Sequence, residues 1–264
     1  MPQIETAQNM RTPIHAGFGR LLQQWHAELI ADTPGVAEYK ARPFAEAAAW
    51  APGRMSSAVM EIISAMRKDD PLGTDLPRPR IPRLIVTADR SFVPTPSEVT
   101  RQTVEWVYCR IPDDPKRRIF QIRVPRFDIN MQLVIVAQEW HTAHSLAMQL
   151  YAFLGQMEHR RFQAEYVLAG IPQRWPVMVE TPEIIATPES ESGPNLTIIR
   201  CDLNLRCGAP MLRYPAHGAP DADGKGAGTL DDPDGFIGIN AFDLVEVIGV
   251  PGGELIVMPV AASE

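Results

Sequence analysis

Two histidines three residues apart, His141 and His144, have the spacing best suited to chemistry in this chain. Histidines at i and i+3 share one face of a helix and can bind a metal ion together. No carboxylate follows them at the spacing of a metalloprotease, and the sequence offers no third ligand. We therefore expect both histidines to be structural or solvent-facing, and we predict no metal site.

A glycine-rich acidic stretch at 221–229, DADGKGAGT, begins like a calcium-binding loop, with Asp232 at its twelfth position. Lys225 occupies a ligand position of that loop, and no helices are expected to flank it, so the stretch does not predict calcium binding. It also lacks the GxxxxGK[ST] order of a phosphate-binding loop and follows no strand. We predict neither a calcium site nor a phosphate site here.

The three cysteines, Cys109, Cys201 and Cys207, each lie within an apolar strand pattern. Their odd number and their spacing favour reduced thiols that are buried as small hydrophobic side chains. The chain has no GxSxG or GxGxxG motif, and its carboxylates do not group with a histidine at a recognisable acid–base spacing. We predict no catalytic residues, no bound cofactor and no enzymatic activity.

The charge balance narrows the classes of partner. The 264 residues carry a net charge of −7, which argues against general nucleic-acid binding because that needs a basic surface. The densest local basic patch is at 116–118, and we interpret it as a solvated turn between strands. The sequence has no basic-then-apolar leader and no apolar run near 20 residues, so neither secretion nor membrane spanning is expected.

The element that must organise the fold is a strand running directly into a helix over residues 127–154. Odd positions from Phe127 to Ala137 are apolar, which is the period of a strand lying on a core. Apolar residues then recur at helical spacing from Ala143 to Leu154, and Gly155 is suited to end the helix. We therefore expect a helix over 141–154 that packs back on the sheet.

The other elements predict an α+β fold with a mostly antiparallel, mixed sheet packed by amphipathic helices. Helices are expected near 13–31 and 54–68, with the first ended by the 33–35 Thr-Pro-Gly sequence, and an alanine-rich stretch at 41–50 is a further helix candidate. The sheet is expected within 84–207, and Pro125 should cause a bulge or an edge. Three further strand candidates follow residue 235.

Proline is abundant, at 25 residues, and predicts long extended connections that run over surfaces as arms. We divide the chain into a body at 1–209 and a long loop with a C-terminal strand extension at 210–264. A loop as long as 210–235 is uncommon inside a compact domain.

The segment 118–154, with VPRFDINMQLVIVAQEW followed by HTAHSLAMQLYAFLGQ, resembles the strand and following helix of tail-terminator proteins of contractile-tailed bacteriophages. These proteins are also called tail sheath stabilisers or neck proteins. The resemblance covers roughly residues 79–212 and is one of pattern. It includes RIPRLIVTADRSF before the sheet and NLTIIRCDLNLRCGAPML late in the chain. The helical segment at 42–68 and the extension after Pro210 depart from the family pattern.

This resemblance implies a structural virion protein, with no catalytic residues to carry over. It implies a homohexameric ring that joins the tail tube and sheath to the head–tail connector, assembled in the host cytoplasm. Genomic DNA would pass through the ring without sequence-specific binding, and a net negative ring would let it slide.

Two alternatives remain open at this point. One is another neck, collar or baseplate subunit. The other is a small-molecule-binding α+β domain or enzyme, with a pocket between sheet and central helix lined by His141, His144, Asp128 or Cys109.

Overall fold

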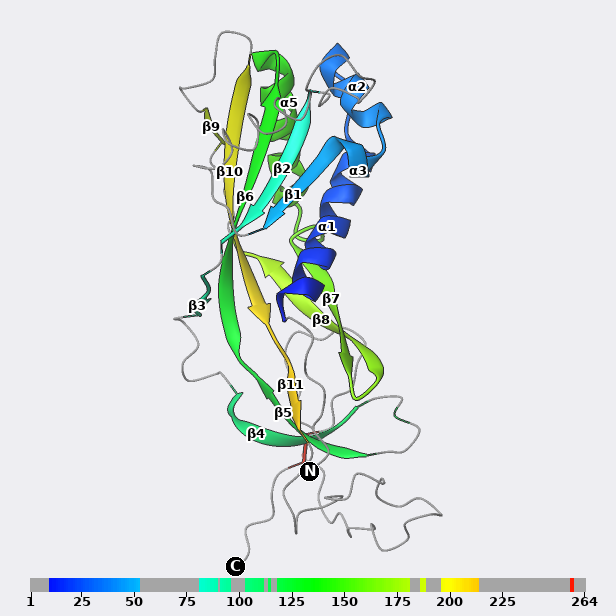
Figure 1. Cartoon of the computed structure of the whole chain (residues 1–264), viewed down its shortest axis with the longest axis vertical. Coiled ribbons are helices and arrows are strands. Elements are labelled where there is room, and N and C mark those ends of the chain that lie inside the picture. Colours follow the sequence, from blue (N-terminus) through cyan, green and yellow to red (C-terminus); the bar gives the residue numbers. More distant parts are fainter. Residues whose placement is uncertain are drawn as a thin grey trace, which may run out of the picture.

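The computed structural model of the chain describes residues 10–52, 81–89, 91–95, 103–111, 114, 118–180, 186–188, 196–213 and 257–258. Over these residues the protein is α+β, with helices packed on a mixed, curled sheet, as expected. Figure 1 shows a large sheet in the upper part of the molecule and a smaller sheet at its lower end. The expected helix at 54–68, the loop at 221–229 and the strand candidates at 236–250 lie outside the described residues.

Two long strands, β6 (Arg126–Ala137) and β10 (Thr197–Gly208), form the centre of the large sheet. They pair antiparallel without a break, from Thr197 opposite Ala137 to Gly208 opposite Arg126. The alternation of β6 places Phe127, Ile129 and every second residue to Ala137 in the main core. The predicted strand is therefore confirmed.

The large sheet has the order β1-β2-β6-β10-β8-β7, with β3 beside β6 and β9 beside β10. All pairs are antiparallel except β1 with β2, which is parallel. The outer strands are β1 (Ala48–Pro52), β2 (Arg83–Ala88), β3 (Val93–Pro94), β7 (Arg161–Leu168), β8 (Ile171–Val179) and β9 (Ala186–Pro188).

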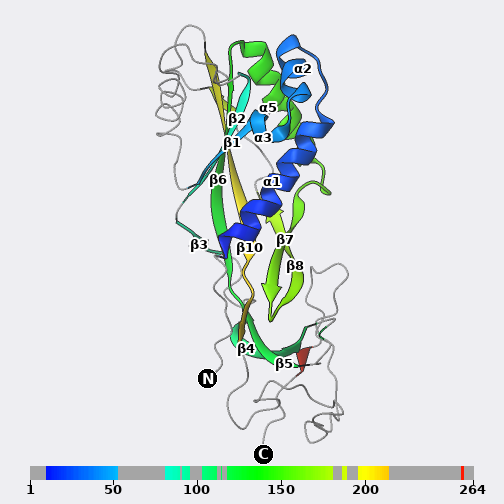
Figure 2. The same cartoon turned by 45° about the vertical axis from the view of Figure 1, so that its right-hand side comes forward.

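The helices cover one face of this sheet, as Figure 2 shows, while β3 lies on the other side of β6 from them. They are α1 (Arg11–Glu28), α2 (Pro34–Ala41), α3 (Phe44–Ala47) and α5 (Trp140–Gly155). The buried stripe of α5 includes Ala143, Leu146 and Leu150, so the expected helix over 141–154 is confirmed.

Two expectations about the N-terminal region are wrong. Thr33 does not end the first helix, because α1 already ends at Glu28. Instead the Thr33 side chain accepts a hydrogen bond from the Val36 N–H and Pro34 occupies the first turn of α2, so the same residues form an N-cap. The alanine-rich stretch at 41–50 is not one helix either. It is helical only over Phe44–Ala47 and then becomes β1.

The large sheet is buried on both faces at its upper end. The main core lies between the sheet and the helices and includes Phe18, Trp25 and Tyr39. A second, smaller cluster lies on the opposite face and consists of Ile85, Val134, Val136, Leu196 and Ile198. This accounts for the even positions of β6 that become apolar after Gln132.

The smaller sheet has the order β11-β5-β4-β12, from β11 (Met211–Arg213), β5 (Ile119–Val124), β4 (Thr103–Arg110) and β12 (Val257–Met258). The β6–β10 pair continues into it, because β5 precedes β6 and β11 follows β10, and β11 pairs with β5. The ladder is interrupted at Pro125, where the Ala209 N–H donates to the Pro125 carbonyl at 3.2 Å. The predicted irregularity at this proline is confirmed.

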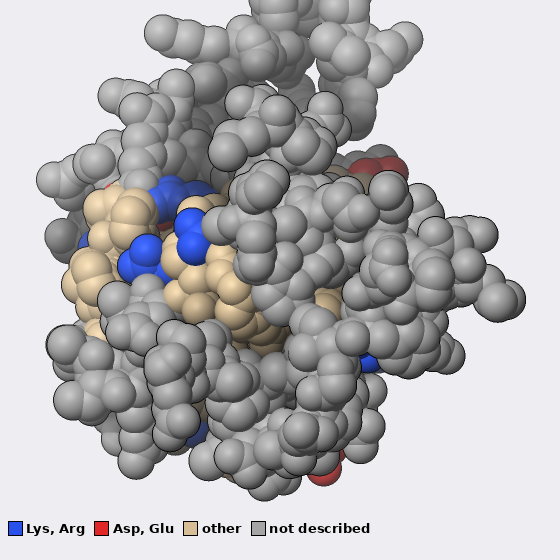
Figure 3. Space-filling model, turned by 90° about the horizontal axis from the view of Figure 1, so that it is seen from below, with Lys and Arg blue, Asp and Glu red and all other residues tan. Residues whose placement is uncertain are grey.

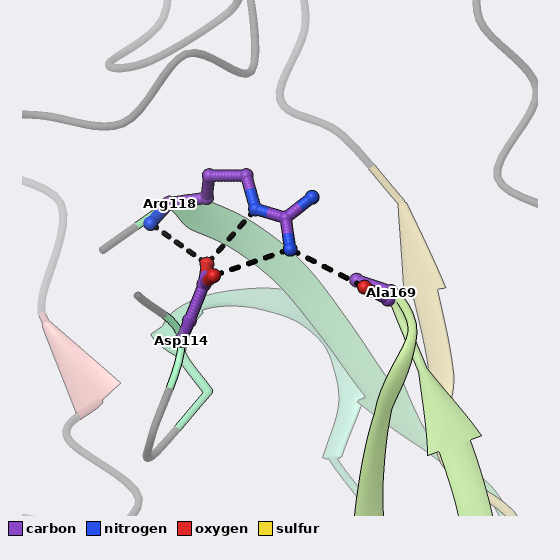
Figure 4. A network of polar contacts seen from close by, with 3 residues as sticks. All are labelled: Asp114, Arg118 and Ala169. Carbon is purple, nitrogen blue, oxygen red and sulfur yellow. Dashed lines mark hydrogen bonds and ion pairs between the residues drawn. The ribbon is translucent and has the colours of Figure 1, made fainter. Parts of the chain in front are cut away.

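A buried ion pair ties the smaller sheet to the large one (Figure 4). The Asp114 carboxylate accepts hydrogen bonds from the Arg118 backbone N–H, Nε and Nη2 at 3.0, 2.9 and 3.2 Å. Arg118 Nη2 also donates to the Ala169 carbonyl at 3.2 Å, in the turn between β7 and β8. Arg118 is thus not the solvated turn residue that we expected from the basic patch at 116–118. The other two residues of that patch lie outside the described residues.

Candidate functional site

The outer side of α5 holds the residues that the sequence singled out for chemistry, next to the loop between α1 and α2. That loop is fixed to the helix by side-chain hydrogen bonds. Gln149 accepts from the Ile30 N–H at 2.7 Å and donates to the Ile30 carbonyl at 2.9 Å. Ser145 Oγ donates to Asp32 Oδ2 at 2.5 Å. Loop and helix therefore form one surface.

A groove of about 490 Å³ lies between the loop and α5, wide open to solvent. Both predicted histidines, His141 and His144, line it and are exposed. The carboxylate in the lining, Asp32, is hydrogen-bonded to Ser145. Within the described residues no group of three His, Cys, Asp or Glu side chains is placed to hold a metal ion. The groove offers histidines to solvent but no converging ligand set.

An exposed apolar stripe runs along α5 beside this groove. Trp140, His144, Met148 and Tyr151 follow one another at four-, four- and three-residue spacing, which places them on one side of the helix. Trp140, Met148 and Tyr151 are 47%, 52% and 44% exposed. The Trp140 ring lies 5.5 Å from the His144 ring, centroid to centroid. We call these four residues the α5 stripe.

The α5 stripe is extended by other exposed apolar residues at the two ends of the helix region. Ile30 in the anchored loop is 71% exposed and Met157, just after the helix, is 62% exposed. A monomeric protein seldom leaves so many large apolar side chains in one region in water. Sequence reasoning missed this surface because it followed the buried stripe of the same helix. The four- and three-residue spacing of Trp140, Met148 and Tyr151 was the available signal.

The structure does not bring the residues of the expected pocket together. Asp128 lies on β6, where it accepts from Thr95 Oγ1 at 2.9 Å and pairs with Arg206 at 3.5 Å. Cys109 is buried on β4 in the smaller sheet, at the lower end of the molecule, whereas the two histidines lie on α5 at the upper end (Figure 1). Asp128 and Cys109 line neither the groove beside α5 nor the groove between α1 and β7.

The three cysteines are free and buried, as expected. Burial raises the pKa of the Cys109 thiol to about 12. Burial, and to a smaller extent the charge of Asp202, raises the pKa of Cys201 to about 12. Burial and then Asp128 raise the pKa of Cys207 as well. All three are therefore protonated and unreactive at neutral pH.

A second groove, of about 310 Å³, lies between α1 and β7. Arg20 and Arg174 both approach Glu165 at 3.8 Å across it. These side chains are half exposed or more, so the groups are solvated and the ion pairs are weak. We find no reactive arrangement in this groove.

No helix among the described residues has both the length and the apolar character needed to cross a bilayer.

Comparisons with known proteins add little. No family model matches the chain, and no curated protein matches it. One solved structure aligns with 78% of this chain and 98% of its own length, at 16% sequence identity and a TM-score of 0.31. Similarity at this level carries no conclusion about fold or function.

Proposed function

We propose that this protein is a structural subunit of a contractile phage tail, a ring-forming tail terminator or neck protein that joins the tail tube and sheath to the head–tail connector. The observation that carries the proposal is the α5 stripe with Ile30. Trp140, Met148 and Tyr151 present large, half-exposed apolar side chains on a helix whose other face is fixed in the core, and Ile30 adds an exposed side chain from the loop beside it. Such a patch is suited to a permanent contact with another protein.

The rigid body supports the same role. The paired β6 and β10 strands, with α5 packed against them, form a firm support for an interface. In a ring, each subunit uses one surface to contact a different surface of the next, and this contact repeats until the ring closes. The α5 stripe would supply one of these two surfaces.

The proline-rich connections and the segment 210–264 belong to this proposal as arms. In an assembly they would lie over neighbouring subunits or add strands to their sheets. Proline favours this because it holds a chain extended without a partner strand. The arms would stabilise the ring after the α5 stripe has made the first contact.

The first test is the mass of the purified full-length chain by light scattering, with electron microscopy of the same sample. We expect a closed ring; a hexamer of the 29.3 kDa chain has a mass of about 176 kDa. A stable monomer at micromolar concentration, absent from virions, would refute the proposed function.

A charge placed in the α5 stripe tests the carrying observation. Met148→Glu should dissociate the ring, because a carboxylate buried in an apolar contact without a partner is costly. Gln23→Glu is the matched control, since Gln23 is exposed on α1 and gains the same charge. The control should keep the oligomer mass. Equal masses for wild type and Met148→Glu would show that the stripe is not the contact.

A further inference from the structure

One face of the smaller sheet carries arginines on three neighbouring strands, together with Ile119, which is fully buried opposite Arg110. Arg213 lies opposite Gln121 and Gln121 opposite Tyr108 in the register of β11, β5 and β4, so these residues share one face. Arg123 and Arg110 are two residues from Gln121 and Tyr108 on their strands and therefore lie on the same face. The opposite face carries the apolar residues that join the main core: Cys109, Phe120, Ile122 and Leu212.

Two aromatic side chains lie among these arginines. The Arg213 guanidinium lies over the Trp106 ring, 4.1 Å from its centroid, and Arg213 Nε donates to Gln121 Oε1 at 2.8 Å. Tyr108 stands beside Gln121 in the register. Gln121 is buried in the middle of the face, whereas Trp106, Tyr108, Arg110 and Arg123 are half-buried and Arg213 is exposed. We call Arg110, Arg123 and Arg213 the arginine face.

The arginine face lacks neutralising carboxylates within the described residues. Arg118, Arg206 and Arg174 each form an ion pair with an aspartate or glutamate. No such pair is formed by Arg110, Arg123 or Arg213 in the described part of the chain. Arg110 Nε is buried and has no hydrogen-bond partner among the described residues.

The charge of the chain is therefore distributed unevenly. The sequence segments 103–124 and 209–213, which contain β4, β5 and β11, hold six Lys or Arg and three Asp or Glu, a net charge of +3 in a chain of net charge −7. Figure 3 views this end of the molecule and shows Lys and Arg atoms gathered on its uncovered part. Within the described residues, the smaller sheet and its connections therefore carry more Lys and Arg than Asp and Glu.

We propose that the arginine face binds the phosphate backbone of nucleic acid, without reading its sequence. Guanidinium groups match phosphate oxygens in geometry and charge, and a sheet face that presents them beside aromatic rings is typical of nucleic-acid surfaces. The guanidinium groups of Arg110, Arg123 and Arg213, which form no ion pair within the described residues, would gain phosphate acceptors in this contact. Its setting rests on the proposed function: in a ring through which DNA passes, this end of each subunit would face the DNA.

The test is fluorescence anisotropy of a labelled 20-base-pair DNA duplex with the full-length protein between 50 and 200 mM salt. Three phosphate contacts predict a logarithmic salt slope of about −2.7 for each protomer that binds, so affinity should fall by about 40-fold over this range. The double variant Arg110→Gln/Arg123→Gln should retain about one third of the slope, with a fall of about 3.5-fold.

Three further variants separate a direct contact from general charge or misfolding. Arg20→Gln/Arg174→Gln removes two positive charges away from the arginine face and should keep the wild-type slope. Arg110→Lys/Arg123→Lys keeps the charges and should keep most of the slope. Arg213→Gln changes an exposed residue, so it should fold normally and lose about one third of the slope.

The proposal is overturned if the wild-type protein does not bind the duplex at 50 mM salt. It is also overturned if Arg110→Gln/Arg123→Gln and Arg213→Gln keep the wild-type slope, or if polyglutamate competes as well as unlabelled DNA, which would assign the face to an acidic protein. Light scattering on the same samples distinguishes the two proposals. A monomer that binds DNA refutes the proposed ring but supports the arginine face as a nucleic-acid contact. A ring that does not bind DNA supports the proposed ring but refutes the nucleic-acid contact.

Discussion

The ion pair between Asp114 and Arg118 should be among the most sensitive polar contacts of the fold. The Asp114 side chain is fully buried and that of Arg118 is 15% exposed, and three hydrogen bonds join them. Asp114→Asn keeps the shape of the side chain but leaves the Arg118 guanidinium buried without its counter-charge. Removing one partner of a buried pair costs about 3–5 kcal/mol, and the partial exposure of Arg118 favours the lower end, about 3 kcal/mol.

Urea unfolding followed by circular dichroism, at one fixed protein concentration, measures this loss. With a slope of about 2–3 kcal/mol per molar urea, the midpoint of Asp114→Asn should fall by about 1 M or slightly more. Glu165→Gln is the control, because the Arg20–Glu165 pair has half-exposed side chains 3.8 Å apart. Its loss should stay below about 1 kcal/mol.

The single variant Arg118→Met and the double variant Asp114→Asn/Arg118→Met complete a thermodynamic cycle. Replacing both charges with neutral groups of similar size removes the unpaired cation, so most of the stability lost in Asp114→Asn should return. The coupling should be about 2 kcal/mol or more. A loss below about 1 kcal/mol in Asp114→Asn, or a double variant less stable than both single variants, would refute the reasoning.

Two further predictions concern the packing of α1 and the thiols. Gly17→Ala should lower the melting temperature, because a Cβ there would lie 2.7 Å from the Gln163 backbone carbonyl oxygen and overpacking costs about 1–3 kcal/mol. Gly19→Ala on the same helix meets open space and should raise the melting temperature. Equal shifts for the two variants would contradict the close approach of α1 to β7. The buried thiols should react with a disulfide reagent at pH 8 only after unfolding in urea, because their raised pKa values keep the thiolate fraction far below that of an exposed cysteine. Rapid reaction of the folded protein would contradict the burial of the three thiols, those of Cys109, Cys201 and Cys207.

The sequence allowed the central unit of the fold to be predicted because its periods are unambiguous. The apolar odd positions from Phe127 to Ala137 fit a strand that lies on a core, and the stripe from Ala143 to Leu154 fits a helix. The break at Pro125 followed from the missing N–H of proline. The α+β class follows from these elements together.

Other features depend on distant partners and could not be predicted. Alanine has high helix propensity, yet Ala48 and Ala49 are in a strand because β2 offers them a parallel ladder. Thr33 and Pro34 are equally suited to follow one helix or to begin another, and the contact of Gly35 with Thr142 on α5 decides between these. The arginine face also depends on distant partners. Arg110, Arg123 and Arg213 are far apart in sequence and become neighbours only through the pairing of three strands.

The β5–β6 and β10–β11 ribbon has a mechanical consequence. Its strands β6 and β10 run along the long axis of the molecule, and β5 and β11 continue them into the smaller sheet, as Figure 1 shows. A pull along that axis would load many backbone hydrogen bonds in shear at once, and they would resist together instead of peeling apart one after another. The ladder of this ribbon is interrupted at Pro125, so a bend there would leave the regular pairs on either side intact. A subunit built in this way would resist stretching along its long axis and would bend at Pro125.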